Sequence, residues 1–242
     1  MTQTIKFELT QKFEQPILPP VATKRLTPAW LKKMNTGVSK HKLDEWGNPM
    51  QTVKKCVPFV DAITAGYTLL THIDLNLTLV NDELRVVFLD DEHEKKLKEF
   101  NPVETHPRLQ VEGTPFEDFR ILKYITPWKI KVPDGWSLLF LPPMNQFELS
   151  YIPLCGLVDA DTYDGVVNFP FICPNIGEGV HVMIPAGSPF IQIIPVKRDE
   201  WKEEIVVYNE EQYKQHKKYR DHMHANKKDY YRKNAWQKKK YT

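Results

Sequence analysis

Long apolar runs, paired cysteines and a secretory signal are all missing from this sequence of 242 residues. No run approaches the ~18 consecutive apolar residues that a membrane span requires. Residues 2–16, TQTIKFELTQKFEQP, lack the basic-then-apolar order of a signal peptide. The three cysteines, Cys56, Cys155 and Cys173, lie far apart and include no C-x-x-C pair. We therefore expect a soluble protein that is neither secreted nor membrane-bound, with buried thiols and without a disulfide framework or a zinc site.

The charge is distributed unevenly along the chain. The formal net charge is only +2, but residues 209–242 contain nine lysines and two arginines against four acids. This segment therefore carries about +7 and the preceding residues about −5. We expect a mildly acidic folded body and a strongly basic tail.

Residues 1–58 have the pattern of an N-terminal arm. The stretch FEQPILPP is rich in proline and favours an extended backbone. A short helix is expected after it, because Pro28 suits the first helical position and Trp30, Leu31 and Met34 recur at helical spacing. The face that carries Trp30 either binds a partner protein or packs on the chain's own body.

Residues 59–201 show the pattern of short strands. In HIDLNLTLV, residues 72–80, apolar and polar residues alternate as in a half-buried strand. Similar segments follow, separated by turns such as P-D-G and P-A-G: ELRVVFLD, WKIKV, SLLFL, GVVNFPFI, VHVMI and PFIQIIPV. The pattern predicts a mainly all-β domain, a sandwich or a barrel. The exception is DDEHEKKLKEF, residues 90–100, whose acids precede its lysines and predict a short helical insertion with a solvated charged face.

Four segments of this body stand in an order that is typical of one family. They are AGYTLL (65–70), KVPDGWSLLFLPPMNQF (131–147), GLVDADTYDGVVNF (156–169) and MIPAGSPFIQIIP (183–195). Together they resemble the motifs of the trimeric dUTPase and dCTP deaminase superfamily. The chain up to Trp201 is also similar to uncharacterised proteins of tailed bacteriophages. These resemblances imply a dUTPase-like β-barrel of the β-clip type, a homotrimer and a phage protein.

The resemblance carries part of the family's site onto this chain. Asp159 matches the acid that activates the attacking water in dUTPases, and Asp161 matches the second acid of the same loop. Tyr163 matches the aromatic residue that stacks on the deoxyribose, displaced by one inserted residue, and Gln192 matches the glutamine of the closing strand. We therefore expect a vestigial ligand pocket at these four residues. If the protein is active, Asp159 is its catalytic residue.

Other positions depart from the family. Thr68 stands where the family has an aspartate, and Met144 and Asn145 stand where it has arginine and serine. Asn168 replaces the glutamate of the deaminases and cannot act as an acid or base. Two carboxylates without a phosphate-facing arginine repel a triphosphate, which carries about four negative charges. We therefore predict no catalytic residue, no cofactor and no metal, with Mg²⁺ expected only if the chain hydrolyses a nucleotide.

These departures favour a function without catalysis. We expect a virion structural component or an assembly factor that uses the barrel as an oligomeric scaffold. Its partners are then other copies of itself and other phage proteins, in the virion or in the host cytoplasm. The alternative is a nucleotide-binding protein or a dUTPase-like pyrophosphatase.

Residues 202–242 form the basic tail. Acids near its start, lysines at its end and the absence of proline and glycine predict a helix from about Asn209. Aromatic residues are interleaved with the basic ones, namely Tyr213, Tyr219, Tyr230, Tyr231 and Trp236. They either anchor the tail on a protein, together with Trp30, or stack on bases while the cations neutralise phosphates. The pattern favours the protein partner and leaves nucleic acid as the alternative.

Overall fold

The computed structural model of the chain describes residues 2–38, 42–44, 47, 49–225 and 230–242. Contacts divide the chain into two units. The β unit contains residues 1–26 and 65–198, and the tail unit contains residues 27–64 and 199–242. The sequence predicts a different division, into residues 1–58, 59–201 and 202–242. That division into domains stays a prediction.

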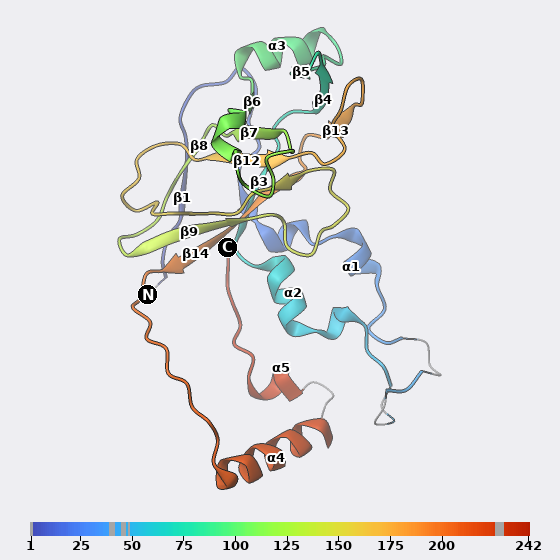
Figure 1. Ribbon diagram of the computed structural model, residues 1–242, viewed down its shortest axis with the longest axis vertical. Coiled ribbons are helices and arrows are strands. Elements are labelled where there is room, and N and C mark those ends of the chain that lie inside the picture. Colours follow the sequence, from blue (N-terminus) through green and yellow to red (C-terminus); the bar gives the residue numbers. More distant parts are fainter. Residues whose placement is uncertain (1, 39–41, 45–46, 48, 226–229) are drawn as a thin grey trace. The chain divides into compact units, whose positions relative to one another are not determined.

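The strands of the β unit pair in the antiparallel direction and form four sheets (Figure 1). The largest has the order β11-β9-β14-β3-β2 and the second has the order β10-β12-β7-β6. A third has the order β13-β4-β5, and β1 pairs with β8 alone. The strands are β1 Lys6–Leu9, β2 Val21–Ala22, β3 Tyr67–Leu70, β4 Leu75–Val80, β5 Glu83–Val86, β6 Val103–Thr105, β7 Ile121–Ile125, β8 Trp128–Lys131, β9 Trp136–Leu141, β10 Ile152–Pro153, β11 Gly156–Val158, β12 Asn168–Ile172, β13 Val182–Ile184 and β14 Pro189–Lys197.

The predominance of strands confirms the predicted all-β class. The expected closed barrel is not found, because the strands of the described residues remain in four separate sheets. Residues 2–26, which belong to the expected N-terminal arm, also take part in the sheets. Their strand β1 pairs with β8 and their strand β2 pairs with β3, so this segment supplies two edges of the β unit.

An aromatic cluster joins the two larger sheets. Phe190 on β14 is fully buried, and its ring centroid lies 4.3 Å from that of Tyr124 on β7 and 5.2 Å from that of Phe171 on β12. Tyr151 stacks on the same ring at 5.2 Å. Strand β12 alternates between buried and less buried residues, as a strand with one face on a core does. The core of the β unit therefore lies between the inner faces of these two sheets.

Two backbone features set the register of the strands. Asn81 and Asp82 both adopt positive φ angles, 54° and 61°, which is the conformation of a two-residue hairpin turn between β4 and β5. Gly66 has a φ of +68°, and a Cβ atom there would lie 2.0 Å from the carbonyl oxygen of Ile193. Only glycine fits at this point, where β3 joins β14 and Thr68 comes opposite Gln192.

The predicted helical insertion is confirmed as α3, Asp91–Glu99. The carboxylate of Asp90 caps it by accepting a hydrogen bond from the backbone N–H of His93 at 2.8 Å. His93 and Leu97 face inward and are buried. Two of the lysines pair with glutamates four residues earlier, so the charged face lies in solvent as expected.

The tail unit is helical. Its helices are α1 Ala29–Lys33, α2 Val57–Thr64, α4 Glu210–Ala225 and α5 Tyr230–Asn234. Asn209 and Gln212 form reciprocal side-chain to backbone hydrogen bonds at 2.9 Å, which is a capping box at the start of α4. The tail is thus helical from the residue expected, and it returns to an irregular backbone after Asn234.

The thiols do not all follow the expectation of burial. Cys173 is buried in the core, and burial raises the pKa of its thiol to about 12. Cys56 and Cys155 are exposed. Both belong to short connecting segments between elements, where a small side chain has no sheet or helix face to be packed against.

Candidate functional site

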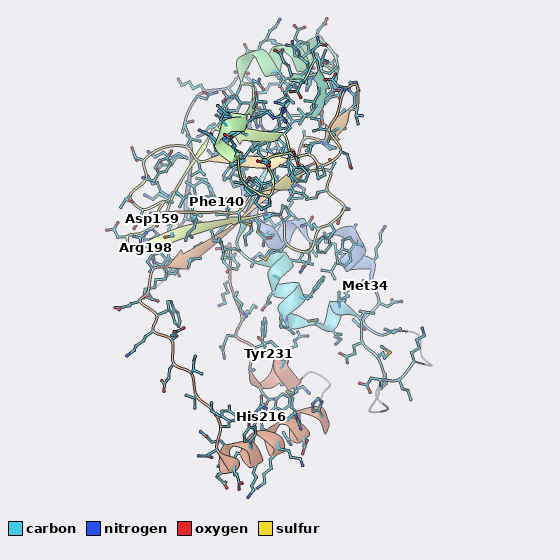
Figure 2. The ribbon with its side chains drawn as sticks, in the orientation of Figure 1. Met34, Phe140, Asp159, Arg198, His216 and Tyr231 are labelled. Atoms are coloured by element: carbon cyan, nitrogen blue, oxygen red, sulfur yellow. The ribbon has the colours of Figure 1, made fainter. Side chains whose placement is uncertain are left out.

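The loop that contains Asp159 and Asp161 lies at one end of the largest sheet. Strand β9 pairs with β11 so that Leu138 lies opposite Val158, and it pairs with β14 so that Trp136 lies opposite Lys197. The start of β9, the end of β11 and the end of β14 therefore meet at the same edge. This register brings the loop next to Arg198, as Figure 2 shows for Asp159 and Arg198.

Arg198 binds Asp161 with both of its terminal nitrogens. Nη1 donates to Oδ1 at 2.9 Å, and Nη2 donates to Oδ2. The same carboxylate accepts backbone N–H groups of Gly135 and Thr162, each at 2.9 Å. The side chain of Asp161 is only 3% exposed. Arg198, followed by these amides, holds the pKa of the Asp161 carboxyl well below its usual value, so Asp161 stays ionised in this network.

Asp159 belongs to the same network but lies nearer to solvent. Its Oδ1 accepts the hydroxyl of Ser137 at 2.6 Å and Nη1 of Arg198 at 3.3 Å, and its side chain is 62% exposed. Its backbone carbonyl accepts N–H groups of Thr162 and Tyr163, which closes the turn. Asp159 is thus the more accessible of the two acids, with a guanidinium and a hydroxyl beside it.

The third acid of the loop, Asp164, is also matched by cations. Lys129 and Lys131 on β8 lie 2.6 Å and 3.0 Å from its Oδ1 and lower the pKa of its carboxyl. Lys131 also donates to the carbonyl of Tyr163 at 2.7 Å. The hydroxyl of Tyr163 donates to the carbonyl of Val166 at 3.3 Å, so its ring lies along its own loop.

These contacts correct the expectation of an uncompensated acidic pocket. Three carboxylates of the loop face three cations of the same chain, and Arg198 is a site residue that the sequence comparison missed. Its motif position differs from that of the family's arginine. No local sequence signal locates it, because its place beside the P-D-G turn follows from the register in which the end of β14 lies opposite Trp136.

Gln192 lies in a different part of the β unit. It is fully buried, its amide nitrogen donates to the carbonyl of Ala65 at 2.7 Å, and its amide oxygen accepts the N–H of Met144 at 2.9 Å. Along β14, Gln192 lies four residues before Val196, the residue opposite Ser137, which is roughly 13 Å. Within one chain, the four predicted pocket residues therefore form a loop cluster and a separate buried glutamine.

Thr68 has a packing role beside this glutamine. It is buried on β3, and its hydroxyl is 2.9 Å from that of Thr23. Asn145 has a positive φ of 59° in the turn after β9. At these two positions, where the sequence departs from the resembling motifs, Thr68 thus pairs with a buried hydroxyl and Asn145 adopts the left-handed conformation of a turn.

The predicted docking residues all lie in the tail unit. Two of them, Trp236 and Trp30, contact residues of α2 in the same unit. The indole N–H of Trp236 donates to Asp61 on α2 at 2.7 Å, and the ring of Trp30 lies 6.4 Å from that of Phe59. Tyr230 is partly buried against Tyr219. The remaining rings are largely exposed, at 60% for Tyr213, 52% for Tyr219 and 46% for Tyr231.

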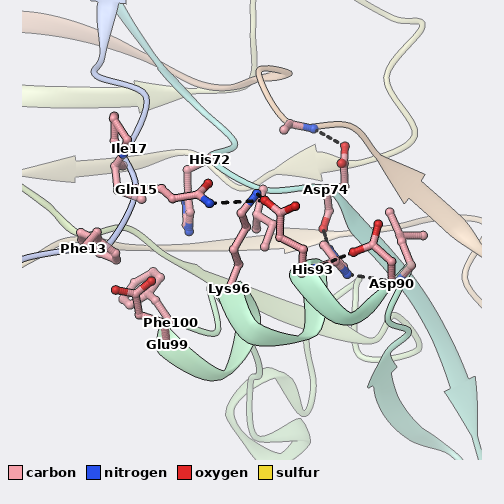
Figure 3. A pocket seen from close by; sticks show the side chains of 15 residues that line it. Phe13, Gln15, Ile17, His72, Asp74, Asp90, His93, Lys96, Glu99 and Phe100 are labelled. Atoms are coloured by element: carbon pink, nitrogen blue, oxygen red, sulfur yellow. Dashed lines mark hydrogen bonds and ion pairs between the residues drawn. The ribbon is translucent and has the colours of Figure 1, made fainter.

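A cavity of about 220 Å³ lies beside α3, between this helix and residues 13–17 (Figure 3). Several polar side chains that line it form hydrogen bonds or ion pairs with other residues of the protein. His93 accepts the N–H of Leu89 on Nδ1 at 3.2 Å and donates from Nε2 to the carbonyl of Asp74 at 2.7 Å. Glu92 is paired with Lys96 at 2.8 Å, and burial lowers the pKa of His72 to about 4. This cavity was not predicted from the sequence, and its contacts are those of a packed boundary between an extended segment and a helix.

The loop cluster does not fit a bound Mg²⁺ in this arrangement. A magnesium ion needs several carboxylate oxygens around a vacant point. The point toward which Asp159 and Asp161 are both turned is occupied by the guanidinium of Arg198. Within the described residues, no group of three or more His, Cys, Asp or Glu side chains is placed to hold a metal ion. In the same part of the chain, every helix is too short or too polar to cross a membrane.

Comparisons with known proteins complete the description of the site. No protein-family model matches the chain, and no curated protein matches it. Among solved structures it is similar to the dUTPase from phage phi11 of S. aureus, at 12% identity over 86% of this chain and 98% of that one, with a TM-score of 0.36. It is similar to Staphylococcus bacteriophage 80alpha dUTPase at the same identity, coverage and TM-score. A mutant of the 80alpha enzyme with dUpNHpp gives 13% identity over 86% of this chain and 91% of that one, with a TM-score of 0.34.

Proposed function

We propose that this chain is a non-catalytic phage protein whose β unit serves as an oligomeric scaffold. The observation that carries the proposal is the engagement of both candidate acids by Arg198. A general base has to offer an oxygen to its water or substrate. Asp159, the candidate base, has its Oδ1 occupied by Ser137 and Arg198, and Asp161 has both oxygens bound by Arg198 and by backbone amides. This arrangement suits a clamp that ties a loop, a turn and a strand end together.

The other family positions support the same proposal. Gln192 uses both ends of its amide inside the chain, and Thr68 is paired with Thr23 in the interior. A substrate would have to break these hydrogen bonds, and each one left unmade in a buried place costs about 1–3 kcal/mol. The polar groups of Gln192 and Thr68 therefore have hydrogen-bond partners within the chain, without a ligand.

The proposed oligomer is a homotrimer, as the motif resemblance implies. The β unit exposes large apolar side chains that a partner copy could cover, among them Leu109 at 81%, Phe147 at 90% and Leu157 at 64%. Sedimentation velocity of the purified chain at micromolar concentration tests this directly. The mass of three chains supports the scaffold, and a monomer at all concentrations contradicts it.

The place of the scaffold is the virion or an assembly intermediate. Mass spectrometry of purified virions distinguishes a structural component from an assembly factor that acts in the host cell. A stoichiometric amount in the particle assigns it to the virion. Its presence in capsid precursors and absence from finished particles assigns it to assembly.

One observation favours nucleotide binding or hydrolysis as the second candidate. Asp159 is exposed beside Arg198 and Ser137, so a loop with an acid, a guanidinium and a hydroxyl is open to solvent. A phosphate that took Arg198 away from Asp161 would turn the clamp into a phosphate site. Under this alternative Asp159 is the catalytic residue and Mg²⁺ accompanies the nucleotide.

A further inference from the structure

The cations that follow Asn209 differ from those on α3 of the β unit in having few acidic partners. On α3, Lys95, Lys96 and Lys98 are paired with Glu14, Glu92 and Glu94. Among the described residues after Asn209, Lys239 pairs with Asp61, and no ion pair is formed by the other lysines and arginines. These are Lys214, Lys217, Lys218, Arg220, Arg232, Lys233, Lys238 and Lys240.

Helix α4 is also uncovered over most of its length. All residues from Trp201 to His222 are exposed. The ring contacts of α4 are made within the tail itself, between Tyr213 and Tyr208 and between Tyr219 and Tyr230. These are edge-to-face contacts, with interplanar angles of 78° and 77°, and an edge contact leaves much of a ring face open.

The two kinds of side chain lie next to each other on α4. At about 100° per residue, Arg220, Lys217, Lys214 and Lys218 cover roughly half of the helix circumference. By the same geometry His216 and Tyr219 lie along the adjoining face, and Tyr213 lies between Arg220 and Lys217. A helix of 16 residues without a packed face is marginally stable in water, so a partner that binds both faces would also stabilise the helix.

We propose that the tail, through α4, α5 and residues 235–242, binds single-stranded nucleic acid. The cations neutralise phosphates, and Tyr213, Tyr219 and Tyr231 stack on bases. An apolar groove on a protein would cover the tyrosines and leave the cations listed above without a partner. A flexible polyanion with aromatic bases satisfies both. This function is separate from that of the β unit and holds whether the scaffold or the nucleotide site is the correct account of that unit.

The test is fluorescence anisotropy with a labelled oligo(dT) of about 20 nucleotides, titrated with the full chain at about 50 and 200 mM salt. If about five cations contact phosphates, a slope of about −0.7 per phosphate gives roughly a 100-fold loss of affinity over this range. The tail variant is Lys214→Gln, Lys217→Gln and Lys218→Gln, which keeps good helix-forming residues. It should reduce the slope by about two units and weaken binding at least about tenfold at the lower salt concentration.

A matched control removes the same number of lysines from a helix on which they are paired. The variant Lys95→Gln, Lys96→Gln and Lys98→Gln on α3 should bind the oligonucleotide within about twofold of the wild type, because paired lysines release few counterions. A second variant, Tyr213→Leu with Tyr219→Leu, should weaken binding roughly 5- to 100-fold per stacked base and leave the salt slope unchanged.

Three results would overturn the proposal. They are no binding at the lower salt concentration, an equal loss in the α3 control, and a tail variant that changes the sedimenting mass of the protein without changing oligonucleotide affinity. The last result identifies a protein partner for the tail. Circular dichroism of the tail variant distinguishes loss of contacts from loss of the helix.

Discussion

The β unit and the basic tail after Asn209 differ in how many of their charged side chains form ion pairs. In the β unit the acids of the 159–164 loop and the lysines of α3 find partners within the same chain. In the tail most of the described lysines and arginines form no ion pair. Charges that are satisfied inside a chain stabilise its own structure, whereas clustered charges that are not satisfied are available to a partner. This difference is the basis of the two proposals, a structural role for the 159–164 loop and a binding role for the tail.

The largest expected effect is in the core of the β unit. Phe190→Ala removes the ring that Tyr124, Tyr151 and Phe171 contact, and such a cavity costs about 3–5 kcal/mol. Urea denaturation should show a large fall in the midpoint, and Phe190→Leu should recover most of it. An unchanged midpoint in the alanine variant would mean that this cluster does not hold the two sheets together.

The next effect concerns pH and His72. Burial lowers the pKa of this imidazole from its usual value of 6.5 to about 4, so between these values the unfolded chain binds a proton that the native chain does not. His72 should therefore not affect the free energy of unfolding above the unfolded pKa of 6.5. As the pH is lowered from there to the native pKa of about 4, the free energy of unfolding should fall by about 3 kcal/mol. The variant His72→Gln should show a flatter dependence when denaturation is compared at neutral pH and at about pH 4.5. Equal slopes in the two proteins would contradict the prediction.

A smaller, pH-dependent effect is expected at Arg198. Arg198→Ala leaves the carboxylate of Asp161 without its cation, so the variant should unfold at lower urea concentration at neutral pH. Because the native pKa of Asp161 lies below the unfolded value of about 4, the contribution of the pair is full above that value and is lost as the pH falls below it. The difference between wild type and variant should shrink in acid. Arg198→Lys, which keeps the charge and loses the fork, should lie between them. A difference that does not change with pH would show that the ion pair is not its source.

The smallest effect is expected in the tail. Tyr219→Ala removes a ring as large as those in the core, but from an exposed face of α4, so the stability of the β unit should change by less than about 0.5 kcal/mol. The comparison with Phe190→Ala is made in the same denaturation experiment. A large destabilisation would show that the ring packs on the protein's own body.

Much of the fold followed from local patterns in the sequence. Alternation predicted the strands around residues 75–80 and 189–197, and the order of acids and lysines predicted α3. The predicted closed barrel was not found among the described residues, because the pairing of strands depends on contacts between distant segments, which local patterns do not specify. The same is true of residues 1–26, whose prolines favour an extended chain but do not say that β1 and β2 join sheet edges.

The candidate site was predictable only in part. The loop itself and its two acids could be located from a short motif. The cation that neutralises them could not, because Arg198 lies far along the chain and reaches the loop through the register of β9 with β14. Similarly, Gln192 and Asp159 lie in segments that resemble motifs of one family, but a distance along β14 separates them within a single chain.

The central claim is that the 159–164 loop is a structural clamp and not a catalytic centre. The most direct test is steady-state turnover of dUTP and dCTP with Mg²⁺, measured for the wild type and for Asp159→Asn after sedimentation has shown both proteins to be folded and equally assembled. The account predicts no turnover above the buffer rate for either protein. Turnover by the wild type that is lost in Asp159→Asn would contradict it.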